Sequence, residues 1–186
     1  FVTRKIAQHL DCSQNGLAHT VRITYQNNAQ TDTWPGGKYK NYLRFYLPQN
    51  AQIESVFGEK EGGTRQRRDD FSQGEEEGKK VVALLIEVPI KESYTLEITY
   101  RLPASWQGEK KSLAFLWQKQ PGNKFGEEVT LISYSQDWVL GTIILENSRG
   151  KRITKEPLLG KGTITYLQVL DQDLLFQTEW GEGGSF

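Results

Sequence analysis

The chain has 186 residues, with 23 basic and 23 acidic side chains, so its formal net charge is zero. A chain without net positive charge lacks the long-range field that draws proteins to nucleic acid or to anionic membranes, and we expect it to bind neither directly. Its single cysteine, Cys12, excludes an internal disulfide and the zinc sites that need cysteine pairs.

The length suits one domain, and we expect a single β-sandwich domain over residues 1–186, in which residues 137–186 extend the sheets. Because the chain begins at Phe1 and contains no methionine, we expect it to be a processed piece of a longer product. No apolar run approaches the roughly 20 residues that a membrane-spanning helix needs. Any membrane attachment is therefore expected to come from a segment outside this chain.

The first two strands are predicted at residues 1–10 and 17–25, where apolar and polar side chains alternate with a period of two. Turn-forming residues at 11–16 predict a loop between them, and residues 27–37 predict a polar connection to the next strand.

The third strand, residues 39–48, follows the turn sequence Trp-Pro-Gly-Gly at 34–37. Its alternation assigns one face to the core, with Leu43, Phe45 and Leu47. The other face carries tyrosines and cations in turn, namely Lys40, Tyr42, Arg44 and Tyr46.

The middle of the chain predicts three further strands. Residues 52–57 form a short one, and residues 58–80 predict an exposed, mobile segment with a brief strand near Phe71. Residues 81–88 are almost continuously apolar, which indicates a strand in the middle of a sheet, buried on both faces. Residues 93–102 alternate again and end at a proline.

The last third predicts only strands. Segments 112–118 and 128–134 are expected to form a hairpin, because Pro121-Gly122 marks a turn between them. Four more extended segments follow at 139–145, 153–157, 163–170 and 174–180. Ten or more short strands without an amphipathic helix predict an all-β fold: an antiparallel two-sheet β-sandwich, Ig-like or jelly-roll-like, with little or no helix.

The sequence offers little catalytic chemistry. His9 and His19 are the only histidines, and no glycine-flanked serine of the GxSxG kind accompanies them. We therefore expect no catalytic residue and a protein that is not an enzyme. Paired carboxylates drawn from two strands, as in glycoside hydrolases, stay open as an alternative because any strands can supply them.

A charged cluster in residues 65–80 contains five carboxylates, Asp69, Asp70, Glu75, Glu76 and Glu77. Their spacing matches no calcium loop. Basic residues among them compete for the same oxygens, so a solvated loop is the expected structure, with no metal and no cofactor.

Aromatic side chains beside cations provide the candidate ligand site. Flat aromatic surface next to a cation stacks on sugar rings or packs on a protein partner. The candidate residues are Trp34, Tyr42, Arg44, Tyr46 and Trp106. Tyrosine and arginine are also ordinary on the wet face of a sheet. Trp117, Trp138 and Trp180 fall within or beside strands and are expected in the core.

Four segments, at residues 20–27, 34–48, 86–103 and 116–124, resemble one known family, and their most specific parts read WPGGKYKNYLRFYLP and LWQKQPGNK. That family is the uncharacterised bacterial cell-envelope family called domain of unknown function 4012. The resemblance implies a membrane-anchored bacterial surface protein whose bulk lies outside the cell. It brings no catalytic residues with it.

Three functions are therefore in competition. The first is a non-enzymatic, extracytoplasmic structural or interaction module of a bacterial surface protein, with a cell-envelope glycan or another surface protein as its partner. The second is a carbohydrate-binding module that uses the exposed aromatics. The third is a hydrolase of envelope polymers.

Overall fold

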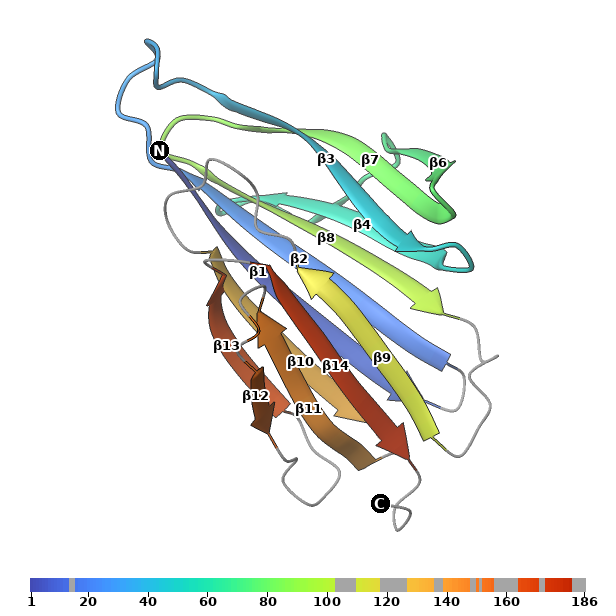
Figure 1. The fold of residues 1–186 in the computed structure, drawn as a ribbon. Coiled ribbons are helices and arrows are strands. Elements are labelled where there is room, and N and C mark those ends of the chain that lie inside the picture. Colours follow the sequence, from blue (N-terminus) through green and yellow to red (C-terminus); the bar gives the residue numbers. More distant parts are fainter. Residues whose placement is uncertain are drawn as a thin grey trace. The chain divides into compact units, whose positions relative to one another are not determined.

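The structure is a computed structural model that describes residues 1–13, 16–102, 110–117, 127–135, 139–147, 150, 152–155, 164–170 and 173–181. These residues contain fourteen strands and no helix, so no membrane-spanning helix occurs among them (Figure 1). The chain separates into two compact units. The first comprises Phe1–Gln8 and Ala18–Pro103, and the second comprises His9–Leu17 and Ala104–Phe186. That the chain is one domain with residues 137–186 as an extension stays a prediction.

The first unit contains two antiparallel sheets. One has the order β1-β2-β8-β4-β5, with β1 at Val2–Ser13, β2 at Gly16–Asn27, β8 at Ser93–Leu102, β4 at Gln52–Lys60 and β5 at Gln66–Arg67. The other has the order β3-β7-β6, with β3 at Tyr39–Pro48, β7 at Lys79–Val88 and β6 at Ser72–Glu76. The predicted all-β architecture of antiparallel sheets is confirmed, and the described residues of the whole chain contain fourteen strands where ten or more were expected.

The core lies between these sheets because the strands bury alternate residues. Side chains of β8 alternate between buried and half-buried along the whole strand, and β3 buries Leu43 and Leu47 as predicted. The facing strand β7 contributes Val82, Leu84, Ile86 and Val88, all nearly inaccessible to solvent. Burial of this apolar surface is the main stabilising contribution to the unit.

Asn27, at the end of β2, ties this core to the connection that precedes β3. Its side chain is 1% exposed. The Nδ2 group donates to the carbonyl oxygens of Gly37 at 2.9 Å and Val88 at 3.1 Å, and Oδ1 accepts from the amide of Ala29 at 3.1 Å. The residues before β3 are thereby anchored to the last residue of β7.

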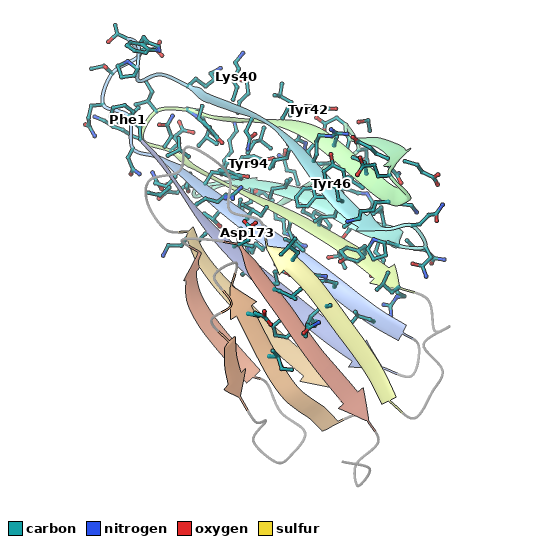
Figure 2. The ribbon with its side chains drawn as sticks, in the orientation of Figure 1. Phe1, Lys40, Tyr42, Tyr46, Tyr94 and Asp173 are labelled. Atoms are coloured by element: carbon teal, nitrogen blue, oxygen red, sulfur yellow. The ribbon has the colours of Figure 1, made fainter. Side chains whose placement is uncertain are left out.

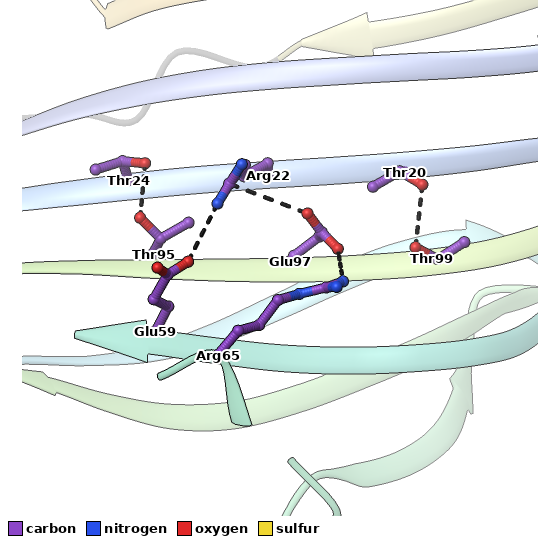
Figure 3. Close-up of polar contacts among 8 residues, drawn as sticks. All are labelled: Thr20, Arg22, Thr24, Glu59, Arg65, Thr95, Glu97 and Thr99. Carbon is purple, nitrogen blue, oxygen red and sulfur yellow. Dashed lines mark hydrogen bonds and ion pairs between the residues drawn. The ribbon is translucent and has the colours of Figure 1, made fainter. Parts of the chain in front are cut away.

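On the outer face of the five-stranded sheet, polar side chains of neighbouring strands bind one another (Figure 3). Thr20 of β2 pairs with Thr99 of β8, and Thr24 pairs with Thr95, each at 3.0 Å between hydroxyl oxygens. Between these two threonine pairs, Arg22 lies 3.2 Å from Glu59 and 4.0 Å from Glu97. These cross-strand partners satisfy one another, which indicates a structural face rather than a binding site.

Two predicted loops are in part strand. β1 continues to Ser13, into the loop predicted at 11–16, and β4 continues to Lys60, into the segment predicted to be mobile. The brief strand expected near Phe71 is confirmed as β6, which pairs with β7. Glu77 and Gly78, with φ angles of 49° and 71°, close the β6–β7 hairpin in the left-handed conformation that two-residue hairpin turns require.

The second unit is also built of antiparallel strands. Strand β10 (Glu127–Ser135) pairs with β13 (Ile164–Leu170). A four-stranded sheet has the order β12-β11-β14-β9, with β12 at Arg152–Lys155, β11 at Val139–Asn147, β14 at Leu174–Gly181 and β9 at Lys110–Trp117. The predicted hairpin of 112–118 with 128–134 is wrong, because β9 pairs with β14 and β10 with β13.

Candidate functional site

The tyrosine and cation face of β3 is open to solvent. Tyr42 is 60% exposed and Tyr46 is 48% exposed, and both are among the most exposed large hydrophobic side chains of the described residues. Lys40, Tyr42 and Tyr46 follow one another along β3 (Figure 2). The tyrosine and cation face of β3 is therefore a surface of the protein.

The neighbouring strand β7 completes this face. The antiparallel register places Leu85 beside Tyr42, Ala83 beside Arg44 and Val81 beside Tyr46. Leu85 is 48% exposed, so the prediction that β7 is buried on both faces is wrong at this position. Strand β6 reaches only as far as Ser72, opposite Ala83, and does not extend alongside Leu85.

An ion pair crosses this face from one edge strand of the sheet to the other. The guanidinium of Arg44 donates to Oε2 of Glu76. The hydroxyl of Tyr46 donates to the same carboxylate oxygen at 3.4 Å, and the Arg44 guanidinium carbon lies 5.2 Å from the centre of the Tyr46 ring. Arg44 and Tyr46 are thus held together by Glu76 as a cation and an aromatic ring in contact.

A hollow of about 390 Å³ lies in this face. Val81 and Ala83, each 6% exposed, are the apolar residues of β7 that line it. Its other lining residues come from β3 and β6 and are mostly polar: Tyr42, Arg44, Ser72, Gln73, Gly74, Glu75 and Glu76. An aromatic ring, a small apolar surface and several hydrogen-bonding groups therefore surround one shallow space.

A second charge cluster lies at the start of β3. Glu87 of β7 accepts from Lys38 at 3.0 Å and from Lys40 at 3.1 Å. Hydrogen bonds from Lys38 and then from Lys40 hold the pKa of the Glu87 carboxyl below its usual value. The charge of Lys40 is therefore partly neutralised within the chain.

The two predicted tryptophans do not join this site in the described residues. Trp34 is 93% exposed, in the connection before β3, and the peptide bond between Trp34 and Pro35 is cis. The hollow lies beside the second half of β3, far along the strand from Trp34. Strand β6, which lines the hollow, pairs with β7 only over Lys79–Ala83, and these residues pair with Arg44 to Pro48 of β3. Trp106 lies outside the described residues, as do Trp138 and the side chains of Trp117 and Trp180.

His19 is a buried structural residue with partners on both ring nitrogens. Its side chain is 3% exposed. Nδ1 lies 2.6 Å from the Tyr100 hydroxyl and Nε2 lies 2.8 Å from Oε1 of Gln8. Because the amide oxygen only accepts, Nε2 donates to Gln8, and Nδ1 accepts from Tyr100. His9 is exposed on the opposite face of β1.

The acidic cluster is paired largely with arginine. Arg67 lies 3.2 Å from Asp69, and Arg68 donates to Asp70 at 2.7 Å. The hydrogen bond from Arg68 is the main reason why the pKa of Asp70 lies below its usual value. Arg68 also donates to the Tyr94 hydroxyl at 2.6 Å and to the Leu85 carbonyl at 3.1 Å. Within the described part of the chain, no group of acidic, histidine or cysteine residues is arranged to hold a metal ion.

Sequence reasoning missed several residues of this site. Glu76, Ser72 and Gln73 fell within the segment expected to be a solvated loop, and Leu85 was assigned to the core. The available signal was Gly78, because glycine is favoured in two-residue hairpin turns, and it would have placed β6 beside β7.

Comparison with known proteins does not assign the chain to a family. No protein-family model matches it, and no curated protein matches it. Among solved structures, it is similar to aminopeptidase A of Legionella pneumophila in complex with aspartic acid, with 16% identity over 97% of this chain and 21% of that chain and a TM-score of 0.43. It is also similar to BcpA, the major pilin subunit of Bacillus cereus, with 10% identity over 95% of this chain and 65% of that chain and a TM-score of 0.30.

The chain therefore spans about a fifth of the aminopeptidase and less than two thirds of the pilin subunit. At these scores neither likeness establishes a shared fold.

Proposed function

We propose that this chain is a non-enzymatic interaction module of a bacterial surface protein, and that it binds its partner through the outer face of the β3-β7-β6 sheet. Its place outside the cell and its membership of the domain of unknown function 4012 family are parts of the same proposal. They are supported by the resemblance of residues 20–27, 34–48, 86–103 and 116–124 to that family.

One observation carries the proposal: large apolar side chains are exposed together on a regular sheet face. Tyr42 and Leu85 are neighbours in the β3–β7 register and are 60% and 48% exposed. Exposed aromatic and aliphatic side chains that lie beside an arginine are typical of the contact surfaces of interaction modules.

The chemistry of the described residues supports binding more than catalysis. His19 has hydrogen-bond partners on both ring nitrogens and lies in the core, away from solvent. Glu76 is paired with Arg44, and Asp70 is paired with Arg68. The hydrogen bond from Arg68 lowers the pKa of Asp70, which is the opposite of what a general acid needs.

Carbohydrate is the second candidate partner, and the hollow beside Tyr42 favours it. Sugars present an apolar face of C–H groups and a rim of hydroxyl groups, so their sites combine an aromatic ring with planar polar side chains. Tyr42 supplies the ring, and Gln73 and Glu75 supply the polar groups. The hydrolase alternative has no such observation in its favour.

The proposal is tested by binding to bacterial cell-envelope material. The purified chain is titrated with soluble glycan strands released from cell walls, and binding is followed by isothermal titration calorimetry. We expect saturable binding that Tyr42→Ala weakens about tenfold or more, because truncation of a central aromatic contact typically costs more than 1 kcal/mol.

Trp34→Ala provides the matched control. It removes a more exposed aromatic residue that lies outside the hollow, so binding through the sheet face should survive it. Equal loss in both variants would contradict a site at the hollow. If glycans fail to bind, the same comparison of variants with an isolated surface-protein fraction tests the protein-partner form of the proposal.

A further inference from the structure

Strand β3 is a long edge strand of the first unit, because among the described strands it is paired with β7 alone. It lies at one end of the order β3-β7-β6, and all ten of its residues pair with β7 without a bulge (Figure 1). A long, regular edge strand exposes a row of backbone donors and acceptors that can pair with another strand. Strand β5, which ends the other sheet beside β4, and strand β6, at the opposite edge of the β3-β7-β6 sheet, have only two and five residues.

The usual protection of such an edge is weakened here. Charged side chains prevent edge pairing because bringing two like charges together is unfavourable. Glu87 lies 3.1 Å from Lys40, and Glu76 is paired with Arg44, so both cations are partly neutralised. A second strand is then repelled mainly where two cations lie directly opposite each other.

We propose that β3 pairs antiparallel with β3 of a second copy of this chain, in the register that is centred on Leu43. In this register the outer faces match, with Tyr42 opposite the second copy's Arg44 and Lys40 opposite its Tyr46. Each of these two pairs of a cation and an aromatic residue occurs twice because the dimer is two-fold symmetric, which gives four cross-strand pairs. On the inner face, Leu43 meets Leu43 and Asn41 meets Phe45.

The neighbouring registers bring less favourable residues opposite each other. Centring the pair on Tyr42 places Lys40 opposite Arg44, and centring it on Arg44 places that residue opposite itself, so both bring like charges together. A shift by one residue sets the outer face of one copy against the inner face of the other. Centring the pair on Asn41 or on Phe45 leaves only two cation–aromatic pairs, so the register centred on Leu43 forms the most.

This pairing joins two three-stranded sheets into one six-stranded sheet and doubles the exposed face that carries Tyr42. Association through one strand edge buries a small area, so the dimer is weak and forms with rising concentration. The inference does not depend on the identity of the ligand that the face binds. A symmetric dimer would present two copies of the hollow to a repetitive partner.

The register is tested by disulfide cross-linking in a Cys12→Ser background. A protein with Tyr42→Cys is mixed with one that has Arg44→Cys, and each is also oxidised alone. Directly opposite residues of an antiparallel pair lie within disulfide range, whereas residues offset by two positions do not. We expect a cross-linked dimer in the mixture and none in either protein alone.

A second pair, Lys40→Cys mixed with Tyr46→Cys, repeats the test without changing Arg44. Circular dichroism confirms that each variant is folded. Cross-linking of Tyr42→Cys alone would overturn the register, and absence of cross-links in both mixtures would overturn the pairing.

Sedimentation equilibrium tests the association itself on the whole chain. Tyr42→Lys sets like charges opposite each other in the predicted register, and we expect it to raise the dimer dissociation constant about tenfold or more. Trp34→Ala, which changes an exposed aromatic outside β3, should leave it unchanged. A wild-type chain that stays monomeric to millimolar concentration would overturn the proposal.

Discussion

Arg44 of β3 and Glu76 of β6 form an ion pair that passes over the intervening strand β7. The two residues are 32 positions apart in the sequence, and the hydroxyl of Tyr46 donates to the same carboxylate. This contact links the two edge strands of the sheet and places a cation, a carboxylate and an aromatic ring beside one hollow. It therefore defines the candidate site more than any single side chain does.

Glu76→Gln should change stability little. Both members of the pair are 43% exposed, and exposed ion pairs contribute at most about 1 kcal/mol to the free energy of unfolding. Urea denaturation should thus show a loss below about 1 kcal/mol, while ligand binding at the hollow weakens. A loss of several kcal/mol would mean that the pair supports the fold rather than the site.

Tyr100→Phe should destabilise the first unit by about 1 to 3 kcal/mol, because Nδ1 of His19 loses its donor in a site closed to water. Equilibrium urea unfolding measures the change. Tyr46→Phe is the matched control, since it removes a hydroxyl from an exposed tyrosine and should have nearly no effect. Equal effects of the two substitutions would contradict a structural role for the buried histidine.

Alkaline pH should destabilise the protein through Tyr25. Burial, partly offset by Arg4, raises the pKa of Tyr25 from 10.0 to about 12. Because the pKa of Tyr25 is higher in the folded state, the unfolded chain loses this proton first as the pH rises. The contribution of Tyr25 to stability is therefore complete below pH 10 and is lost between pH 10 and 12. The loss approaches about 2 to 3 kcal/mol.

The measurement is the free energy of unfolding of wild type and Tyr25→Phe across this pH range. The wild type should lose more stability than the variant, because phenylalanine has no proton to release. Burial also raises the pKa of Tyr100, so the variant should keep part of the slope. Parallel curves for the two proteins would contradict the effect assigned to Tyr25.

Gly58→Ala should destabilise β4. A Cβ atom at Gly58 would lie 2.0 Å from the hydroxyl oxygen of Tyr94, whose ring is buried and cannot move aside freely. Such crowding typically costs 1 to 3 kcal/mol. Thermal unfolding measures the loss, and Gly74→Ala, where a Cβ meets nothing within 4 Å, is the control. A similar melting temperature for Gly58→Ala and wild type would show that Tyr94 repacks.

Side-chain alternation predicted much of the fold, because the two faces of a strand are encoded locally. β8 was predicted with the bounds that the structure has, and the core and surface faces of β3 were assigned correctly. The exposed position of Tyr42 and Tyr46 follows from the same periodicity.

Pairing between strands was not predictable, since it depends on contacts between residues distant in the sequence. Pro121-Gly122 suggested a hairpin, yet β9 pairs with β14 and β10 with β13. Gly58 signalled a loop because glycine is common there, but it is a strand residue that makes room for Tyr94. Glu76 joins the site only through the return of β6 onto β7.

The most direct test of the central claim is a map of amide chemical-shift changes on titration with the bound envelope fragment. We predict changes confined to the neighbourhood of Tyr42, Arg44 and Leu85, which Tyr42→Ala abolishes and Trp34→Ala does not. Changes centred on the connection at Trp34, or none on β3 while the fragment binds, would contradict a binding surface on the β3-β7-β6 sheet.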